Sequence, residues 1–247
     1  MFHRLTVALA VAACFSTCMA SGEESAGLAV RALLLVPGGP VVKLNMVSGE
    51  KVGEAVQIGA GGLSESFKPA AREFSLATPD TRRESGYRAV AKISLPEQGK
   101  DFIILLEPAK EMFKVHVVNG RDSGFAADCL LFFNASDTIL GASLGGSKIL
   151  IKPRLPVFAK APPRGEKPFY QVTFYQPDNN KARPFANTRW PHRDASRCYV
   201  FFYRSETGRL TYQAVDESLA AVAAAECIPS ENPNPPSHDT PLATAFP

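Results

Sequence analysis

The sequence lacks the motifs that identify most cofactor-binding and metal-binding proteins. It contains no GxxxxGK[ST] phosphate loop and no CxxC or HxxxH pair, and its four histidines are scattered along the chain. It also lacks a charge excess, since 27 basic residues face 24 acidic ones, whereas a nucleic-acid partner favours a strongly basic surface. We therefore predict no cofactor, no metal site and no nucleic-acid partner.

Long apolar stretches are also absent, because no run reaches the roughly 20 residues that a membrane-spanning helix needs. The first residues nevertheless have the pattern of a secretory signal peptide, with Arg4, an apolar run over 5–15 and a small residue, Ala20, at the expected cleavage point. We predict that residues 1–20 are removed and that the protein is exported to the periplasm or the extracellular space. No transmembrane segment is expected.

Cysteine is scarce, with five in the whole chain. Cys14 ends "VAAC", which resembles a bacterial lipobox, so a lipid anchor at this residue is the alternative to simple cleavage. Cys129, Cys198 and Cys227 follow the predicted signal peptide, and an odd number permits at most one intramolecular disulfide in an oxidising compartment. The candidate pair is Cys198 with Cys227, and buried thiols are the other interpretation.

Short apolar or alternating runs separated by turn residues dominate the rest of the chain. In 113–119, for example, Lys114, His116 and Val118 alternate with Phe113, Val115 and Val117, which is typical of a half-buried strand. Many such runs predict a mainly β protein with an antiparallel sandwich-type architecture. The runs lie at 29–36, 41–47, 87–95, 101–107, 113–119, 129–136, 147–153, 169–176, 198–204 and 209–215.

One short C-terminal helix is predicted at 217–227, because this segment is rich in alanine and Asp216 could cap its first turn. The following residues, 228–247, are rich in proline and have no sustained apolar pattern, which predicts a disordered tail.

A faint internal repeat suggests that the protein consists of two related β halves. "ALLLVPGG" at 32–39 resembles "CLLFFNAS" at 129–136, and Asn119 and Asp216 end two similar runs at the same offset of 97 residues. Pro96 and Phe102 align in the same way with Pro191 and Tyr199. The fourth block is 67–79 with 151–163, at an offset of 84 residues, and four blocks in the same order predict two copies of one unit. The predicted copies are 29–120 and 128–216, joined at 120–128.

The order of runs in each half, a strand with a PGG or NAS turn, a central strand pair and a proline turn before an aromatic strand, resembles exported bacterial domains built as tandem immunoglobulin-like sandwiches. The function of those domains is unknown. The resemblance covers most of the chain after the signal peptide. It implies a fold and carries over no functional residue.

One stretch combines residue types that suit ligand binding. "NTRWPHRDASR" (187–197) contains the only tryptophan of the chain, and we interpret it as a loop on which an exposed aromatic ring could stack on a sugar while arginines bind carboxylates or phosphates. The candidate ligand-binding residues are Arg189, Trp190, His192, Arg193 and Arg197. The plain alternative is that Trp190 packs on the sandwich edge and the arginines are solvated. In a third interpretation, His192 is a general base oriented by Asp194.

These observations favour a non-catalytic structural or binding module of the cell envelope or extracellular space. The alternative is a carbohydrate- or anion-binding module that uses the Trp/Arg loop, with a glycan or an anionic ligand as its partner. A hydrolase is the third possibility. A serine-nucleophile elbow requires a strand-to-helix turn, which the predicted all-β architecture lacks.

Overall fold

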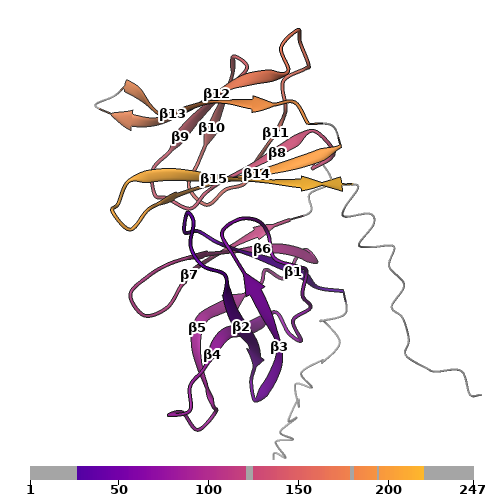
Figure 1. Ribbon diagram of the computed structural model, residues 1–247, viewed down its shortest axis with the longest axis vertical. Helices are drawn as coiled ribbons and strands as arrows, with labels where there is room; N and C mark the ends of the chain where they lie inside the picture. Colours follow the sequence, from indigo (N-terminus) through magenta and orange to yellow (C-terminus); the bar gives the residue numbers. More distant parts are fainter. Residues whose placement is uncertain (1–26, 121–124, 179–180, 194, 220–247) are drawn as a thin grey trace, which may run out of the picture.

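The chain forms four β-sheets stacked face to face in the computed structural model (Figure 1). The structure describes residues 27–120, 125–178, 181–193 and 195–219. No helix within these ranges is long and apolar enough to cross a membrane. The predicted signal peptide, the lipobox cysteine Cys14 and the predicted tail at 228–247 lie outside the described residues.

The first sandwich contains seven strands in two sheets. Its outer sheet has the order β3-β2-β4-β5, and its inner sheet has the order β1-β6-β7. The strands are β1 (Ala29–Leu34), β2 (Val42–Ser48), β3 (Lys51–Ile58), β4 (Glu73–Pro79), β5 (Tyr87–Ser94), β6 (Asp101–Glu107) and β7 (Lys114–Asn119).

The second sandwich contains eight strands. Its outer sheet has the order β10-β9-β12-β13, and its inner sheet has the order β11-β8-β14-β15. Apart from β11, both sheets repeat the strand order of the first sandwich. The strands are β8 (Cys129–Asn134), β9 (Leu140–Leu144), β10 (Ser147–Ile151), β11 (Val157–Lys160), β12 (Phe169–Asp178), β13 (Lys181–Pro191), β14 (Ser196–Arg204) and β15 (Leu210–Ser218).

The two inner sheets are covered on both faces, which explains their nearly continuous apolar sequences. On β6, Phe102 and Ile104 point into the core of the first sandwich, whereas Ile103 and Leu105 point into a central core between the sandwiches. The second inner sheet alternates in the same way. A strand that is buried on both faces reads as an apolar run rather than as an apolar/polar alternation. The central core therefore joins both halves into one stack.

The predicted alternation in 113–119 is confirmed. Phe113, Val115 and Val117 pack against the core of the first sandwich, while Val118 belongs to the central core. His116 is buried beside the ring of Phe133 at a centroid distance of 6.1 Å, so it faces the central core as well.

A polar cluster also connects the halves at the edge of the central core. Arg31 on β1 forms an ion pair with Glu217 on β15 and lies 3.6 Å from the Asp101 carboxylate. The hydroxyl of Tyr199 donates a hydrogen bond of 2.6 Å to the other oxygen of Glu217. Since these side chains are largely buried, the cluster fixes β15 against the first sandwich.

Two expectations about the elements were wrong. The inner sheets are mixed rather than antiparallel, because β1 pairs with β6 and β8 pairs with β14 in parallel. The segment predicted to begin a helix at residue 217 instead continues β15 through Ser218, paired with Ser196. Asp216 is therefore a strand residue paired with Cys198 and not a helix cap. Residues 220–227 of that prediction lie outside the described residues.

Candidate functional site

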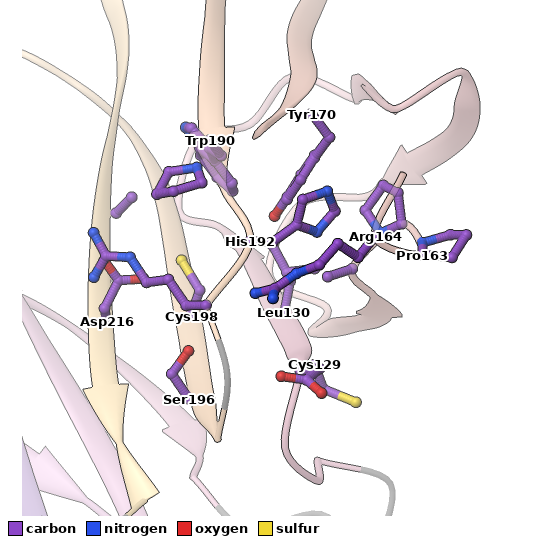
Figure 2. A pocket seen from close by; sticks show the side chains of 16 residues that line it. Cys129, Leu130, Pro163, Arg164, Tyr170, Trp190, His192, Ser196, Cys198 and Asp216 are labelled. Carbon is purple, nitrogen blue, oxygen red and sulfur yellow. The ribbon is translucent and has the colours of Figure 1, made fainter. Parts of the chain in front are cut away.

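A pocket of about 340 Å³ opens at one end of the second sandwich (Figure 2), where β13 and β15 end and β8 and β14 begin. Its lining combines three prolines, the rings of a tyrosine, a tryptophan and a histidine, two cysteines and several other polar groups. The lining residues are Asp128, Cys129, Leu130, Ala161, Pro162, Pro163, Arg164, Tyr170, Trp190, Pro191, His192, Arg193, Ser196, Cys198, Ala214 and Asp216.

Tyr170, Trp190 and His192 form the aromatic part of the pocket (Figure 2). Tyr170 and Trp190 are paired across β12 and β13, and their ring centroids are 6.4 Å apart. The ring of His192 lies 5.0 Å from that of Tyr170. Trp190 also touches Phe174 in the core, so its indole is half-buried and held in place while part of it remains accessible.

Asp216 and Arg193 form the polar part of the pocket. An Arg193 nitrogen lies 2.5 Å from an Asp216 oxygen, so a hydrogen-bond donor and an acceptor stand side by side. Cys198 is directly opposite Asp216 in the β14–β15 register. Burial raises the pKa of the Cys198 thiol, and the Asp216 carboxylate raises it further, which keeps the thiol neutral. Burial also raises the pKa of Tyr170, helped by Cys198 and Asp216.

Three of the five predicted binding residues, Trp190, His192 and Arg193, meet in this pocket. Arg189 does not, because Asn187–Pro191 is strand rather than loop, and successive side chains of a strand point to opposite faces. Its guanidinium lies 5.1 Å from the ring centroid of Phe169, whose side chain lines a separate hollow together with Arg189.

Arg197 also lies away from the pocket. Its guanidinium is 5.1 Å from the ring centroid of Phe125 in the central core, and one nitrogen is 3.9 Å from Glu217. Arg197 therefore belongs to the polar cluster between the sandwiches. Asp194, the suggested partner of His192, lies outside the described residues.

Only one cysteine of the predicted Cys198–Cys227 disulfide lies within the described residues. Cys198 is a thiol lining the pocket, and Cys227 lies outside the described residues. Tyr170 and Asp216 were not among the predicted binding residues. They reach the pocket only because β12 pairs with β13 and β14 pairs with β15, which brings Tyr170 beside Trp190 and Asp216 beside Cys198.

The hydrogen-bond register identifies which residues of the first sandwich correspond to the pocket. Just beyond the last paired residues of β5, the Leu95 amide donates to the Arg72 carbonyl, and just beyond β13 the His192 amide donates to the Pro168 carbonyl. Leu95 thus occupies the position of His192. By the same register, Ile93 corresponds to Trp190, Phe74 to Tyr170 and Phe102 to Cys198.

All four corresponding residues of the first sandwich are apolar and buried in its core. In the second sandwich, His192 and Tyr170 introduce polar groups at two of these positions, and Trp190 replaces Ile93 with a larger ring. At the fourth position the thiol of Cys198 is much smaller than the ring of Phe102. This difference accounts for an open pocket at an end that the first sandwich fills with apolar side chains.

The same register corrects the alignment of the repeat by one to three positions. Phe102 lies in the core of the first sandwich, whereas Tyr199, its predicted counterpart, lies in the central core. Pro191 corresponds to Ser94 rather than to Pro96. A one-residue shift moves every side chain of a strand to the opposite face, so the predicted offset of 97 could not assign the pocket residues there.

One motif of the sequence was passed over. "GASLG" (141–145) matches the GxSxG pattern of serine-nucleophile elbows. Ser143 lies within β9, opposite Lys148 of the next strand, so the motif has no strand-to-helix turn to hold a nucleophile. Within the described ranges, no three His, Cys, Asp or Glu side chains gather in a way that could hold a metal ion.

No protein-family model matches the chain, and no curated protein matches it significantly. The site must therefore be interpreted from its own chemistry.

Proposed function

We propose that the protein is an exported, non-catalytic binding module and that the pocket around Trp190 holds a saccharide. The observation that carries this proposal is the contrast between the sandwiches. Tyr170, Trp190, His192 and Cys198 line this end of the second sandwich, where the corresponding positions of the first are apolar core residues.

The chemistry of the pocket suits a sugar ring. Trp190 and Tyr170 present aromatic surface to the C–H face of a ring, and both also have a polar end. Arg193 can donate hydrogen bonds to hydroxyl groups while Asp216 accepts them. The volume of about 340 Å³ lies at the lower end of the range for small-molecule sites, which suits one sugar residue.

The paired charges favour a neutral saccharide over an anion. Because Asp216 already compensates Arg193, an anionic ligand would have to compete with a carboxylate inside the pocket. A hydroxyl group can bind without breaking the pair.

The environment of Cys198 supports a non-catalytic role. The thiolate is the nucleophilic form of cysteine, and burial together with Asp216 disfavours that form here. A cysteine nucleophile is usually activated by an adjacent base that lowers its pKa, which is the opposite arrangement.

We also propose that export depends on removal of residues 1–20, with lipidation of Cys14 as the alternative, and that the two sandwiches arose by internal duplication. The matching strand order of their sheets supports duplication and the likeness to tandem immunoglobulin-like domains.

The test is calorimetric titration of the protein lacking residues 1–20 with a panel of neutral oligosaccharides. We expect Trp190→Ala to weaken binding at least tenfold, corresponding to about 1.4 kcal/mol. Asp216→Asn replaces one carboxylate oxygen with an amide group of similar size, so it removes a hydrogen-bond acceptor and should also weaken saccharide binding. Arg189→Gln is the matched control, since Arg189 points away from the pocket on the same strand. Equal affinities for all these variants, or no binding by the unmodified protein, would contradict the proposal.

A further inference from the structure

A second hollow lies at the opposite end of the second sandwich, where the β12–β13 hairpin meets the turn between β14 and β15. Three of its lining residues are arginines and none is acidic, and its volume is about 430 Å³. We call it the arginine hollow, after Arg183, Arg204 and Arg209. Its other lining residues are Gln176, Pro184, Phe185, Gly208 and Leu210.

Arg204 is held in position by uncharged acceptors. One of its nitrogens donates to the Gly208 carbonyl at 2.9 Å, and another donates to the Thr138 hydroxyl at 3.0 Å. These contacts orient the guanidinium without neutralising it. The turn that carries Arg209 is closed by a 2.9 Å hydrogen bond from the Ser205 amide to the Arg209 carbonyl.

Only one of the three arginines has a carboxylate partner among the ion pairs of the described residues. Arg183 lies 3.5 Å from Asp178, and both side chains are well exposed. Glu206 is in the same turn as Arg209 but does not line the hollow. The guanidinium charges of Arg204 and Arg209 therefore have no carboxylate partner among the ion pairs of the described residues.

The positive field at this end of the protein extends beyond the hollow. The pKa of the exposed Asp137 carboxyl is lowered, chiefly by its hydrogen bond and charge interaction with Arg154 and to a smaller degree by Lys114 and Arg204. Lys114 belongs to the first sandwich, where it forms an ion pair with Glu107 at 3.3 Å, so Arg204 is the nearby contributor without a carboxylate partner among the ion pairs of the described residues.

The floor of the hollow is apolar and well packed. Phe185 contacts Phe174 and Phe202 in the core of the second sandwich, with centroid distances of 6.1 and 6.4 Å. Phe185 therefore gives the hollow a fixed base, and the three arginines around it are exposed to solvent.

We propose that the arginine hollow binds a phosphate or sulfate group. Guanidinium groups bind such oxygens through paired hydrogen bonds, and a doubly charged oxyanion matches the two uncompensated charges. The ligand can be the free ion or a substituent of a larger polymer. This site is separate from the saccharide pocket, since the strands β13 and β14 run from one to the other.

The test uses the protein lacking residues 1–20 and two probes, inorganic phosphate and a sulfated polysaccharide. Arg204→Gln/Arg209→Gln is compared with Arg82→Gln/Arg83→Gln, which removes the same charge from the exposed β4–β5 hairpin. We expect the first variant to bind at least one probe tenfold more weakly or worse and the second to bind like the unmodified protein. Trp190→Ala should leave this binding unchanged.

The two probes distinguish the sources of the ligand. Tight binding of the polymer with weak binding of phosphate indicates a polymer substituent, and comparable binding of both indicates the free ion. Equal binding by the two double variants would overturn the proposal, because it would show a general charge effect. Failure of both probes to bind the unmodified protein would overturn it as well.

Discussion

His116 is a buried ionisable residue at the boundary between the sandwiches. Its Nε2 atom lies 2.8 Å from a Glu107 oxygen, and its ring packs beside Phe133. Burial lowers the pKa of His116 from its usual 6.5, and this effect outweighs the opposing influence of Glu107. Lys114 and Arg154 lower it further. The folded protein therefore binds a proton at His116 less readily than the unfolded chain does.

This difference predicts a stability loss in mild acid. Above pH 6.5 the histidine is neutral in both states, and as the pH falls from 6.5 towards the folded pKa only the unfolded chain gains the proton. Each pH unit in that window lowers the free energy of unfolding by up to about 1.4 kcal/mol. Urea unfolding at pH 7.5 and pH 5 should show a larger loss for the unmodified protein than for His116→Gln. Gln213 occupies the corresponding position of the second sandwich, so the variant is compatible with the fold. The same loss in both proteins would refute the assignment.

The binding stretch shows how far single residues could be predicted. The structure places its tryptophan, its histidine and one arginine in a common pocket, and their role in ligand binding stays a prediction. Arg189 and Arg197 lie elsewhere. Arg197 belongs to β14, whereas Arg189 lies in "KARPFANTRWP", which contains prolines and arginines and is not recognisable as a strand. Without the strand, the alternation that turns Arg189 away from Trp190 could not be inferred.

At the scale of elements, the apolar runs predicted the inner strands well and the outer strands less well. The strands β3, β4, β9, β11 and β13 lie outside the runs that the pattern identified. Several of them are exposed along much of their length, so burial leaves little periodicity in their sequences. The parallel pairing of the inner sheets was also not predictable, because an apolar run does not reveal the direction of its partner.

The correspondence of β6 with β14 predicts how the pocket can be closed. Phe102 fills the core at the position that Cys198 occupies in the second sandwich. Cys198→Phe should therefore fill the pocket and weaken saccharide binding at least tenfold, at a cost in stability of about 1–3 kcal/mol from crowding. Cys198→Ala is the control, because it leaves the pocket open. Calorimetry and urea unfolding measure both effects, and unchanged affinity in the Phe variant would show that the ligand binds elsewhere.

At the scale of the whole molecule, the central core makes the four sheets one cooperative unit. Leu33 and Ile103 of the first sandwich pack together with Leu131 and Phe201 of the second. The sequence predicted two halves but could not tell whether they form separate domains, since a residue buried between sandwiches looks like any other core residue. The two sandwiches should thus unfold together.

Cooperative unfolding of the two sandwiches can be tested with a substitution in the first sandwich and the fluorescence of Trp190 in the second. Leu76 is fully buried in the core of the first sandwich, and Trp190 lies in the second. Leu76→Ala should destabilise the protein by about 2–5 kcal/mol. Trp190 fluorescence and far-UV circular dichroism should then report the same lowered urea midpoint. A Trp190 transition that stays at the midpoint of the unmodified protein would show that the halves unfold independently.

The binding role of the pocket is tested most directly by the fluorescence of Trp190, the only tryptophan of the chain. Addition of a neutral oligosaccharide that binds should shift or quench the emission in a saturable way. A sulfated polysaccharide at matched ionic strength should leave it unchanged, because the arginine hollow is at the other end of the sandwich. Emission that no neutral saccharide alters, or that only polyanions alter, would contradict a saccharide site at Trp190.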